Sequence, residues 1–301
     1  MTRRCVGALV LAGATFVAVA RAAVAAAAPS VVDDAGHTVT LAAPAQRVVS
    51  LAPHATELIY AAGGGARLVG TVSYSDYPDA AKQVPRVGDS RALDLERIAA
   101  LKPDLIVVWQ DGNADQQIDR LRALHIPLFV SEPRHLDDIA TSLTRLGVLL
   151  GTSPVANAAA QAFRGDVAQL RARYASRAPV SVFFEVWNRP LMTLNGEHII
   201  SDVIRLCGGR NVFAALKPLV PTVSMEAVLA ANPAAIVTAS ASPDALESWH
   251  AWPTLTAVKR GDLFTIDGDL ITRPAPRIVQ GAAQLCADLD RARKRDTGIA
   301  H

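Results

Sequence analysis

The side chains that most often carry chemistry in proteins, histidine and cysteine, are widely separated in this sequence. The seven histidines are scattered, and neither Cys207 nor Cys286 has a histidine beside it at the spacing of a metal site or a catalytic pair. His135 stands next to Asp137 and Asp138, but acidic residues here are typical of the first turn of a helix. We therefore predict neither a metal site nor a reactive cysteine.

Motifs of the common enzyme classes are absent as well. The sequence contains no G-x-S-x-G, H-E-x-x-H, P-loop or G-x-G-x-x-G motif. The balance of 30 Lys+Arg against 28 Asp+Glu gives a formal charge of +2, and the only basic run, residues 291–295, fits a solvated helix end. We expect no nucleic-acid partner and no catalysis. An exported hydrolase without a recognisable nucleophile motif is kept as the alternative from another class.

Aromatic residues offer a more specific signal. They form only 5% of the chain, yet Tyr74, Tyr77, Trp109 and Trp187 fall at the ends of predicted strands or in the turns beyond them. The carboxyl ends of parallel strands are where α/β sheets bind ligands. Flat aromatic faces at such ends suit a large, partly apolar, planar ligand. Packing in the core is the alternative for each of them.

The elements that must position these residues are repeated along the chain. Residues 94–107 form a short helix, a proline and an apolar β-branched run, and residues 224–237 repeat that order. Asp94 and Ser224 are N-cap residue types, and each is followed two residues later by a glutamate, Glu96 or Glu226. The sequence therefore predicts two related halves.

Strands and helices alternate in both halves, which predicts an α/β fold with mainly parallel sheets. The predicted strands are residues 47–51, 68–72, 104–109, 127–130, 180–186, 235–239 and 263–266. The predicted helices are residues 56–62, 95–101, 116–124, 136–150, 199–207, 225–231 and 276–293.

A long helical segment separates the halves. It starts at Ser153-Pro154 and carries an apolar stripe. We expect two similar lobes, residues 29–152 and 179–301, joined by one stiff backbone helix within residues 153–178, with a ligand cleft between the lobes.

The N-terminus has the order of a secretory signal peptide. Arg3 and Arg4 precede an apolar run over residues 6–20, and A-x-A sites follow near residues 26–28. A transmembrane anchor is the alternative, but the run is shorter than the ~20 residues that span a bilayer. We predict a signal peptide at residues 1–28 and export to the periplasm.

Export changes the interpretation of the cysteines. Removal of Cys5 leaves Cys207 and Cys286 in an oxidising compartment, so one disulfide is the simplest prediction. Two buried free thiols are the alternative.

Several motifs resemble the periplasmic vitamin B12-binding proteins of cobalamin ABC importers, which belong to the class III solute-binding proteins for siderophores, haem and B12. The resemblance covers about residues 46–293. The matching segments are residues 47–58, the Ser-Tyr-Ser-Asp-Tyr-Pro run at 73–78, residues 95–105, Trp109 with Gly112-Asn113, residues 207–213 and residues 276–278 ahead of Cys286.

The resemblance implies a ligand, cobalamin or a related corrinoid, which is transported cargo and no cofactor. Tyr74 and Trp109 would pack on the corrin ring or its nucleotide tail. Asp269 and Arg273 would offer polar contacts to the propionamide groups from the second lobe. Trp187 is an additional aromatic, and His54 is expected to contact the ligand from the loop after the first strand, or else to coordinate the cobalt.

The resemblance also implies partners and a covalent link. Glu96 and Glu226, one in each lobe, match acidic residues that dock on arginines of the membrane permease, which works with its ATPase. Cys207 and Cys286 match a disulfide-forming pair. We expect a monomer. A haem or ferric-siderophore carrier of the same fold remains the alternative, with Tyr74 or His54 as the axial ligand for haem.

Overall fold

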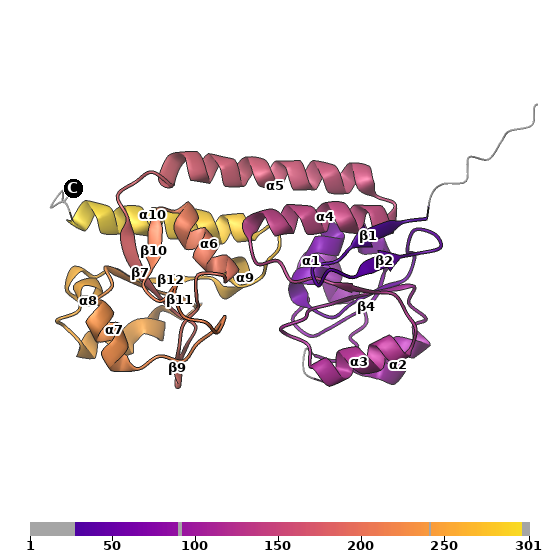
Figure 1. Cartoon of the computed structure of the whole chain (residues 1–301), viewed down its shortest axis with the longest axis horizontal. Coiled ribbons are helices and arrows are strands. Elements are labelled where there is room, and N and C mark those ends of the chain that lie inside the picture. Colours follow the sequence, from indigo (N-terminus) through magenta and orange to yellow (C-terminus); the bar gives the residue numbers. More distant parts are fainter. Residues whose placement is uncertain (1–27, 90–91, 241, 297–301) are drawn as a thin grey trace, which may run out of the picture.

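The computed structural model describes residues 28–89, 92–240 and 242–296, and forms two lobes (Figure 1). The predicted signal peptide, residues 1–28, lies outside the described residues except for its last position. Each lobe holds a four-stranded parallel sheet. The strands of the first are β3 (Val48–Ser50), β4 (Leu68–Thr71), β5 (Leu105–Val108) and β6 (Leu128–Val130), and those of the second are β7 (Val180–Glu185), β10 (Gly209–Asn211), β11 (Ala235–Ala239) and β12 (Leu263–Ile266).

The two sheets have the same topology. The spatial orders are β4-β3-β5-β6 and β10-β7-β11-β12, so in each lobe the first strand lies between the second and the third, and the fourth is at the far edge. The predicted fold of two similar α/β lobes is therefore confirmed. The strand β10 is not among the predicted strands.

Helices cover both faces of each sheet. The first lobe contains α1 (Pro53–Ala61), α2 (Leu95–Ala100), α3 (Asp115–Ala123) and α4 (Leu136–Leu150), with 3₁₀ turns η1 (Gly65–Arg67) and η2 (Asp79–Gln83). The second contains α6 (Ile199–Leu206), α7 (Met225–Ala231), α8 (Thr256–Arg260), α9 (Gly268–Ile271) and α10 (Ile278–Asp296), with the 3₁₀ segment η3 (Pro243–Ala251). Two hairpins were not predicted: β1 (Ser30–Val32) with β2 (Thr38–Thr40), and β8 (Trp187–Asn188) with β9 (Leu191–Met192).

The central strands are continuous apolar runs because both of their faces are buried. Along β5, Leu105 and Val107 point into a core shared with α1 and α4, whereas Ile106 and Val108 point into a second core together with Ile98 of α2. Strand β11 shows the same alternation in the second lobe. Alternation of successive side chains across the sheet is what allows one four-residue strand to serve two cores.

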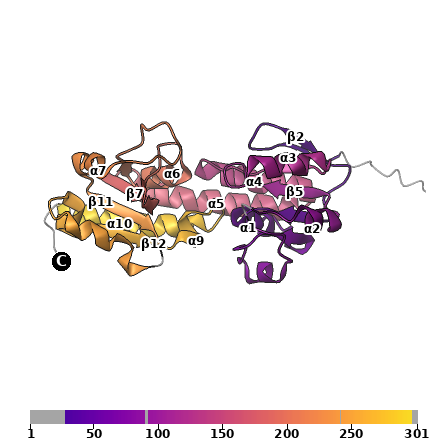
Figure 2. The same ribbon diagram turned by 90° about the horizontal axis from the view of Figure 1, so that it is seen from below.

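The helix α5 (Ser153–Tyr174) runs along both lobes (Figures 1 and 2). It packs on α4 over the first lobe and on α6 and α10 over the second. Its 22 residues span about 33 Å. The helix ends at Tyr174, short of the expected segment 153–178. Its buried side, which includes Phe163 and Val167, belongs to one hydrophobic core that continues from lobe to lobe.

The repeat extends to the ends of the helices. Asp94 and Ser224 cap α2 and α7 by accepting hydrogen bonds from backbone N–H groups three residues ahead, as predicted. The residues after these helices, Lys102 and Asn232, both adopt left-handed conformations, with φ of 46° and 41°, directly before a proline. Prediction of the helix–proline–strand unit from the sequence is thus confirmed twice.

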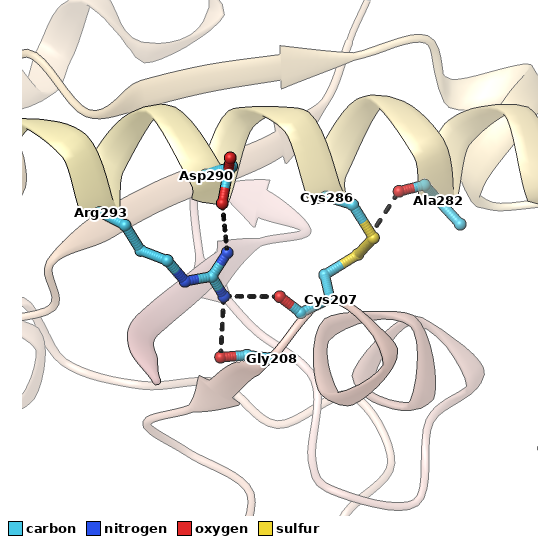
Figure 3. Close-up of a disulfide and its surroundings, with 6 residues drawn as sticks. All are labelled: Cys207, Gly208, Ala282, Cys286, Asp290 and Arg293. Carbon is cyan, nitrogen blue, oxygen red and sulfur yellow. Dashed lines mark hydrogen bonds and ion pairs between the residues drawn. A yellow bond between two sulfur atoms is a disulfide. The ribbon is translucent and has the colours of Figure 1, made fainter. Parts of the chain in front are cut away.

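The predicted disulfide joins Cys207, after α6, to Cys286 on α10 (Figure 3). Beside it, the Arg293 guanidinium donates hydrogen bonds to the backbone oxygens of Cys207 at 2.6 Å and Gly208 at 3.1 Å (Figure 3). A cation at the carboxyl end of a helix satisfies carbonyls that lack helical partners. The disulfide and the arginine together hold α6 against α10.

Among the described residues, no helix is both long and apolar enough to span a membrane. Within the same ranges, no group of three or more His, Cys, Asp or Glu side chains is placed to hold a metal ion. His135 is exposed at the start of α4, where its backbone N–H donates to Asp138 at 2.8 Å. This arrangement is the helix start that the sequence indicated.

Candidate ligand-binding site between the lobes

The carboxyl ends of strands from both sheets meet between the lobes. Trp109 follows β5, Glu132 and Arg134 follow β6, and Thr272 follows α9, the short helix after β12. All four line one pocket of about 50 Å³. The other residues of this pocket are Pro133, His198, Ile199, Leu219 and Pro274. Both lobes therefore build it, at the edge of the sheets where α/β folds bind ligands.

Trp109 is held in place by its neighbours. Its backbone N–H donates to the side chain of Asn113 at 2.8 Å, and the amide of Asn113 donates to Leu51 O at 3.0 Å. The indole lies so close over Gly112 that any added Cβ there would overlap it. Gly112 and Asn113 thus hold the half-buried Trp109 in position, which explains why these three residues occur together in the sequence.

His54 supports Trp109 from the side. The two rings meet edge to face, with centroids 5.4 Å apart and planes at 83°. His54 Nε2 is 3.2 Å from Ser131 Oγ, and the residue is only 2% exposed. Burial lowers the pKa of His54 to about 4, although a hydrogen bond from its ring to the backbone of Ser131 acts in the opposite direction. The imidazole is therefore neutral at neutral pH and lies behind the indole.

An ionic cluster connects the lobes near Asp269 and Arg273. Arg273 Nη1 donates to Asp76 at 2.8 Å and to Glu57 at 3.2 Å, and its Nη2 is 2.6 Å from Asp269. Arg277 donates to both oxygens of Glu57, at 2.9 and 2.6 Å. Glu57 comes from α1 and Asp76 from the loop after β4, whereas both arginines lie between α9 and α10 of the other lobe. We call these five residues the cross-lobe cluster.

Glu57, Arg273 and Arg277, at the centre of the cross-lobe cluster, are shielded from water, whereas Asp76 and Asp269 are partly exposed. The side chain of Glu57 is 2% exposed, and the guanidinium of Arg277 also stacks on the Tyr77 ring at 3.8 Å from its centroid. Partial burial alone would raise the pKa of Asp76, but the hydrogen bond and charge of Arg273 outweigh it and hold that pKa below its usual value. Shielded charges of this kind are paired because an isolated one would be costly.

The remaining predicted aromatics are on the surface. Tyr74 is 78% exposed, with φ of 64°, two residues before Asp76 of the cross-lobe cluster. Trp187 is 61% exposed on the β8–β9 hairpin, where its Nε1 donates to Arg189 O at 2.9 Å. That hairpin projects from the second lobe on the side opposite α5 (Figure 1). Direct contacts thus link Trp109 to His54 and Arg273 to Asp269, while Trp187 stands on a separate element.

No role was predicted for Glu57, Arg277, Glu132, Arg134 or His198. A charged residue within the apolar helix pattern of residues 53–61 was the available signal for Glu57, since a buried carboxylate demands a partner. The others gave no signal, because the residues that surround them in the structure lie far away in the sequence.

Glu96 and Glu226 are both exposed in the first turns of α2 and α7. These helices lie on the same side of the molecule, opposite α5, one under each lobe (Figure 1). Hydrogen bonds from its own backbone N–H and from Ser224 lower the pKa of Glu226, so its carboxylate is charged at neutral pH. The two glutamates therefore present negative charges on one face.

Comparisons with known proteins agree with this architecture. The family model described as "Periplasmic binding protein" matches residues 48–270. The vitamin B12-binding protein of Vibrio cholerae serotype O1 is 38% identical over 253 residues, covering 84% of this chain and 92% of that protein. The vitamin B12-binding protein of Yersinia pestis (strain Pestoides F) is 40% identical over 245 residues, covering 81% and 86%.

Solved structures show the same fold. The periplasmic vitamin B12-binding protein of Vibrio cholerae superposes with a TM-score of 0.78 at 38% identity, covering 83% of this chain and 99% of that one. A periplasmic haem-binding protein from Pseudomonas aeruginosa has a TM-score of 0.69 at 26% identity, covering 81% and 92%. With a family match over most of its length and this degree of identity, the chain belongs to the periplasmic binding protein family, whose members bind solutes and are not enzymes.

Proposed function

We propose that this protein captures cobalamin or a related corrinoid in the periplasm and delivers it to an ABC importer of the inner membrane. The observation that carries the proposal is the site between the lobes, where Trp109 is fixed at the carboxyl end of β5 in a chain 38–40% identical to vitamin B12-binding proteins. The rigid α5 keeps the two halves of this site at a constant spacing.

Aromatic and polar side chains would make different contacts with the ligand. Trp109 and the exposed Tyr74 offer faces for the corrin ring or its nucleotide tail. Asp269 is half-exposed, so it can accept a hydrogen bond from a propionamide group, and Arg273 can donate one after exchanging its bond to Asp76. Trp187 would join the site only if the ligand reaches the β8–β9 hairpin.

Titration calorimetry with cyanocobalamin tests the ligand. We expect binding by the wild-type protein and at least a tenfold loss in Trp109→Ala, because removal of a fixed aromatic face costs more than ~1.4 kcal/mol. Trp252→Ala is the matched control, since that tryptophan lies after η3 in the second lobe. Absence of heat and of any thermal shift at millimolar cyanocobalamin would refute the ligand assignment.

Haem is the second candidate, because a haem-binding protein of known structure shares 26% identity with this chain. Of the two proposed axial ligands, His54 is buried and hydrogen-bonded to Ser131, which leaves Tyr74 as the exposed one. A shifted Soret band on addition of haemin, lost in Tyr74→Phe, would support this candidate. Its absence together with cyanocobalamin binding would decide in favour of the corrinoid.

Delivery to the importer would use Glu96 and Glu226, each docking on an arginine of the permease. Glu96→Ala with Glu226→Ala should abolish ligand-stimulated ATP hydrolysis by the importer in proteoliposomes, with cyanocobalamin affinity retained. Glu247→Ala is a control, because Glu247 is an exposed acid outside α2 and α7. Equal loss of ligand affinity in the double variant would show that the glutamates act elsewhere.

Export would depend on the predicted signal peptide at residues 1–28. The mass of the protein isolated from the periplasmic fraction should correspond to cleavage near residues 26–28. A full-length mass in the membrane fraction would contradict cleavage. Gel filtration with light scattering tests the expectation of a monomer.

A further inference from the structure

The pocket beside Trp109 brings together polar groups from both lobes that the proposed ligand contacts do not use. Glu132 and Arg134 come from the first lobe, and His198, at the start of α6, comes from the second. The pocket of about 50 Å³ accommodates a small functional group and no ring. The residues that line this pocket therefore select which side group of a ligand can enter next to the indole.

His198 supplies a hydrogen-bond donor. Its Nδ1 accepts a bond from the backbone N–H of Ile200 at 3.1 Å, which assigns the proton of the neutral ring to Nε2. Burial, assisted by the charge of Arg134, lowers the pKa of His198 to about 4. The ring is consequently uncharged at neutral pH and carries one N–H donor for the pocket.

Glu132 supplies a hydrogen-bond acceptor from the first lobe. Its Oε2 accepts the Asp111 N–H at 3.0 Å, and its own backbone N–H donates to Asp34 at 2.7 Å. Burial raises the pKa of Glu132 to about 7. The hydrogen bond from the Asp111 N–H and the charge of Arg134 act in the opposite direction, whereas the charges of Asp111 and Asp34 add to the increase. The guanidinium of Arg134 already pairs with Asp111 at 2.9 Å.

These groups suit an uncharged carboxamide better than a carboxylate. A carboxamide both donates and accepts, so it can bond to the Glu132 carboxyl and to the N–H groups of Arg134 and His198. A carboxylate would meet the negative charge of Glu132 without a cation of its own, since Arg134 is already paired with Asp111.

We propose that Glu132, Arg134 and His198 form a specificity subsite that accepts a carboxamide side chain of the ligand and disfavours a carboxylate at the same position. This inference rests on the proposed corrinoid function. The corrin periphery carries carboxamide side chains, whereas haem carries propionates, so the subsite would select between the two ligand classes.

The test compares cyanocobalamin with its separated monocarboxylic acids, in each of which one side-chain amide has been hydrolysed. Calorimetry at pH 8 keeps both the new carboxylate and Glu132, with its pKa of about 7, charged. We expect at least one isomer to bind about tenfold more weakly than cyanocobalamin to the wild-type protein. In Glu132→Gln this ratio should fall to within about threefold, because the repelling charge is gone while the side-chain shape is kept.

Glu197→Gln is the matched control, since it removes a charge from an exposed residue next to His198 and should retain the tenfold ratio. His198→Ser, which keeps an N-cap residue type but removes the ring N–H donor, should weaken the binding of cyanocobalamin. Circular dichroism verifies that each variant is folded.

Equal affinity of the wild-type protein for cyanocobalamin and every isomer would overturn the subsite. So would a ratio that persists in Glu132→Gln, or an unchanged cyanocobalamin affinity in His198→Ser. Absence of cyanocobalamin binding by the wild-type protein is a different result, because it refutes the proposed function itself.

Discussion

The two lobes share one sheet topology, but they differ where they face each other. In the first lobe the strand ends lead to buried polar residues, such as His54 and Ser131, and to a half-buried Trp109. In the second lobe the corresponding region exposes Trp187 on a hairpin and contributes Arg273 and Arg277 to its neighbour. The repeated residues build the sheets, whereas the residues that differ build the site.

The packing of helices within each lobe also differs between the two lobes. A disulfide and Arg293 join α6 to α10 in the second lobe. In the first lobe the equivalent packing of α1 against α4 uses apolar residues such as Leu58 and Leu143. This contrast indicates that the loss of one covalent bond should affect one half of the molecule much more than the other.

The largest expected effect is therefore in the second lobe. Replacing Cys207 and Cys286 by serine should lower the free energy of unfolding by about 4 kcal/mol, because the disulfide closes a separation of 79 residues. This corresponds to about 10 °C in the melting temperature. Hydrogen exchange should accelerate in α6 and α10 before α2 and α3. An unchanged melting temperature of the reduced wild-type protein would contradict the prediction.

A somewhat smaller effect is expected at the junction of the lobes. Glu57→Ala leaves Arg273 and Arg277 without their shared carboxylate, at a cost of about 3 kcal/mol in urea unfolding. Combining Glu57→Ala with Arg277→Met should recover part of the lost stability, because Arg277 is then no longer a buried charge without a partner. The exposed Glu247→Ala should stay within about 0.5 kcal/mol of the wild type. A similarly small loss in Glu57→Ala would mean that the cross-lobe cluster does not join the lobes.

Lowering the pH should reduce the free energy of unfolding through His54, the buried histidine of the first lobe. The pKa of His54 is about 4 in the folded protein against 6.5 for a free imidazole, so the unfolded chain binds the proton more readily. The contribution is complete above pH 6.5 and is lost as the pH falls, by about 2 kcal/mol at pH 5. His54→Asn should flatten the curve of unfolding free energy against pH between 6.5 and 4.5. Parallel curves for the two proteins would show that His54 does not carry this dependence.

The smallest effects compare two glycines. Gly112→Ala forces the Trp109 ring to move, and we expect a loss of about 1 kcal/mol in stability and weaker cyanocobalamin binding. Gly165→Ala on α5 meets no atom within 4 Å and should stabilise the protein by about 0.7 kcal/mol through helix propensity. Urea unfolding and tryptophan fluorescence measure both. Equal changes in the two variants would mean that Gly112 is not needed for the position of the indole.

Much of the fold could be predicted because it depends on local order in the chain. The segments 225–231, 235–239 and 263–266 were predicted with the bounds that the structure has, since proline, caps and apolar runs mark them. The hairpin β8–β9 was missed, because its four residues have no clear alternation. Strand β10 was missed because its glycine and asparagine, Gly209 and Asn211, have low strand propensity, which the pairing with β7 overrides.

By itself the sequence determined the two related halves, the helix between them, the cysteine pair and the aromatic residues at strand ends. All of these follow from periodicity, from residue types and from order along the chain. Only the tertiary structure decided that Glu57 meets Arg273 and Arg277, that His54 supports Trp109, and that Glu132 faces the same pocket as His198. The physical reason is that the role of a charged group or an aromatic ring depends on partners that lie far away in the chain. Those partners become neighbours only when the chain folds and the carboxyl ends of the strands come together.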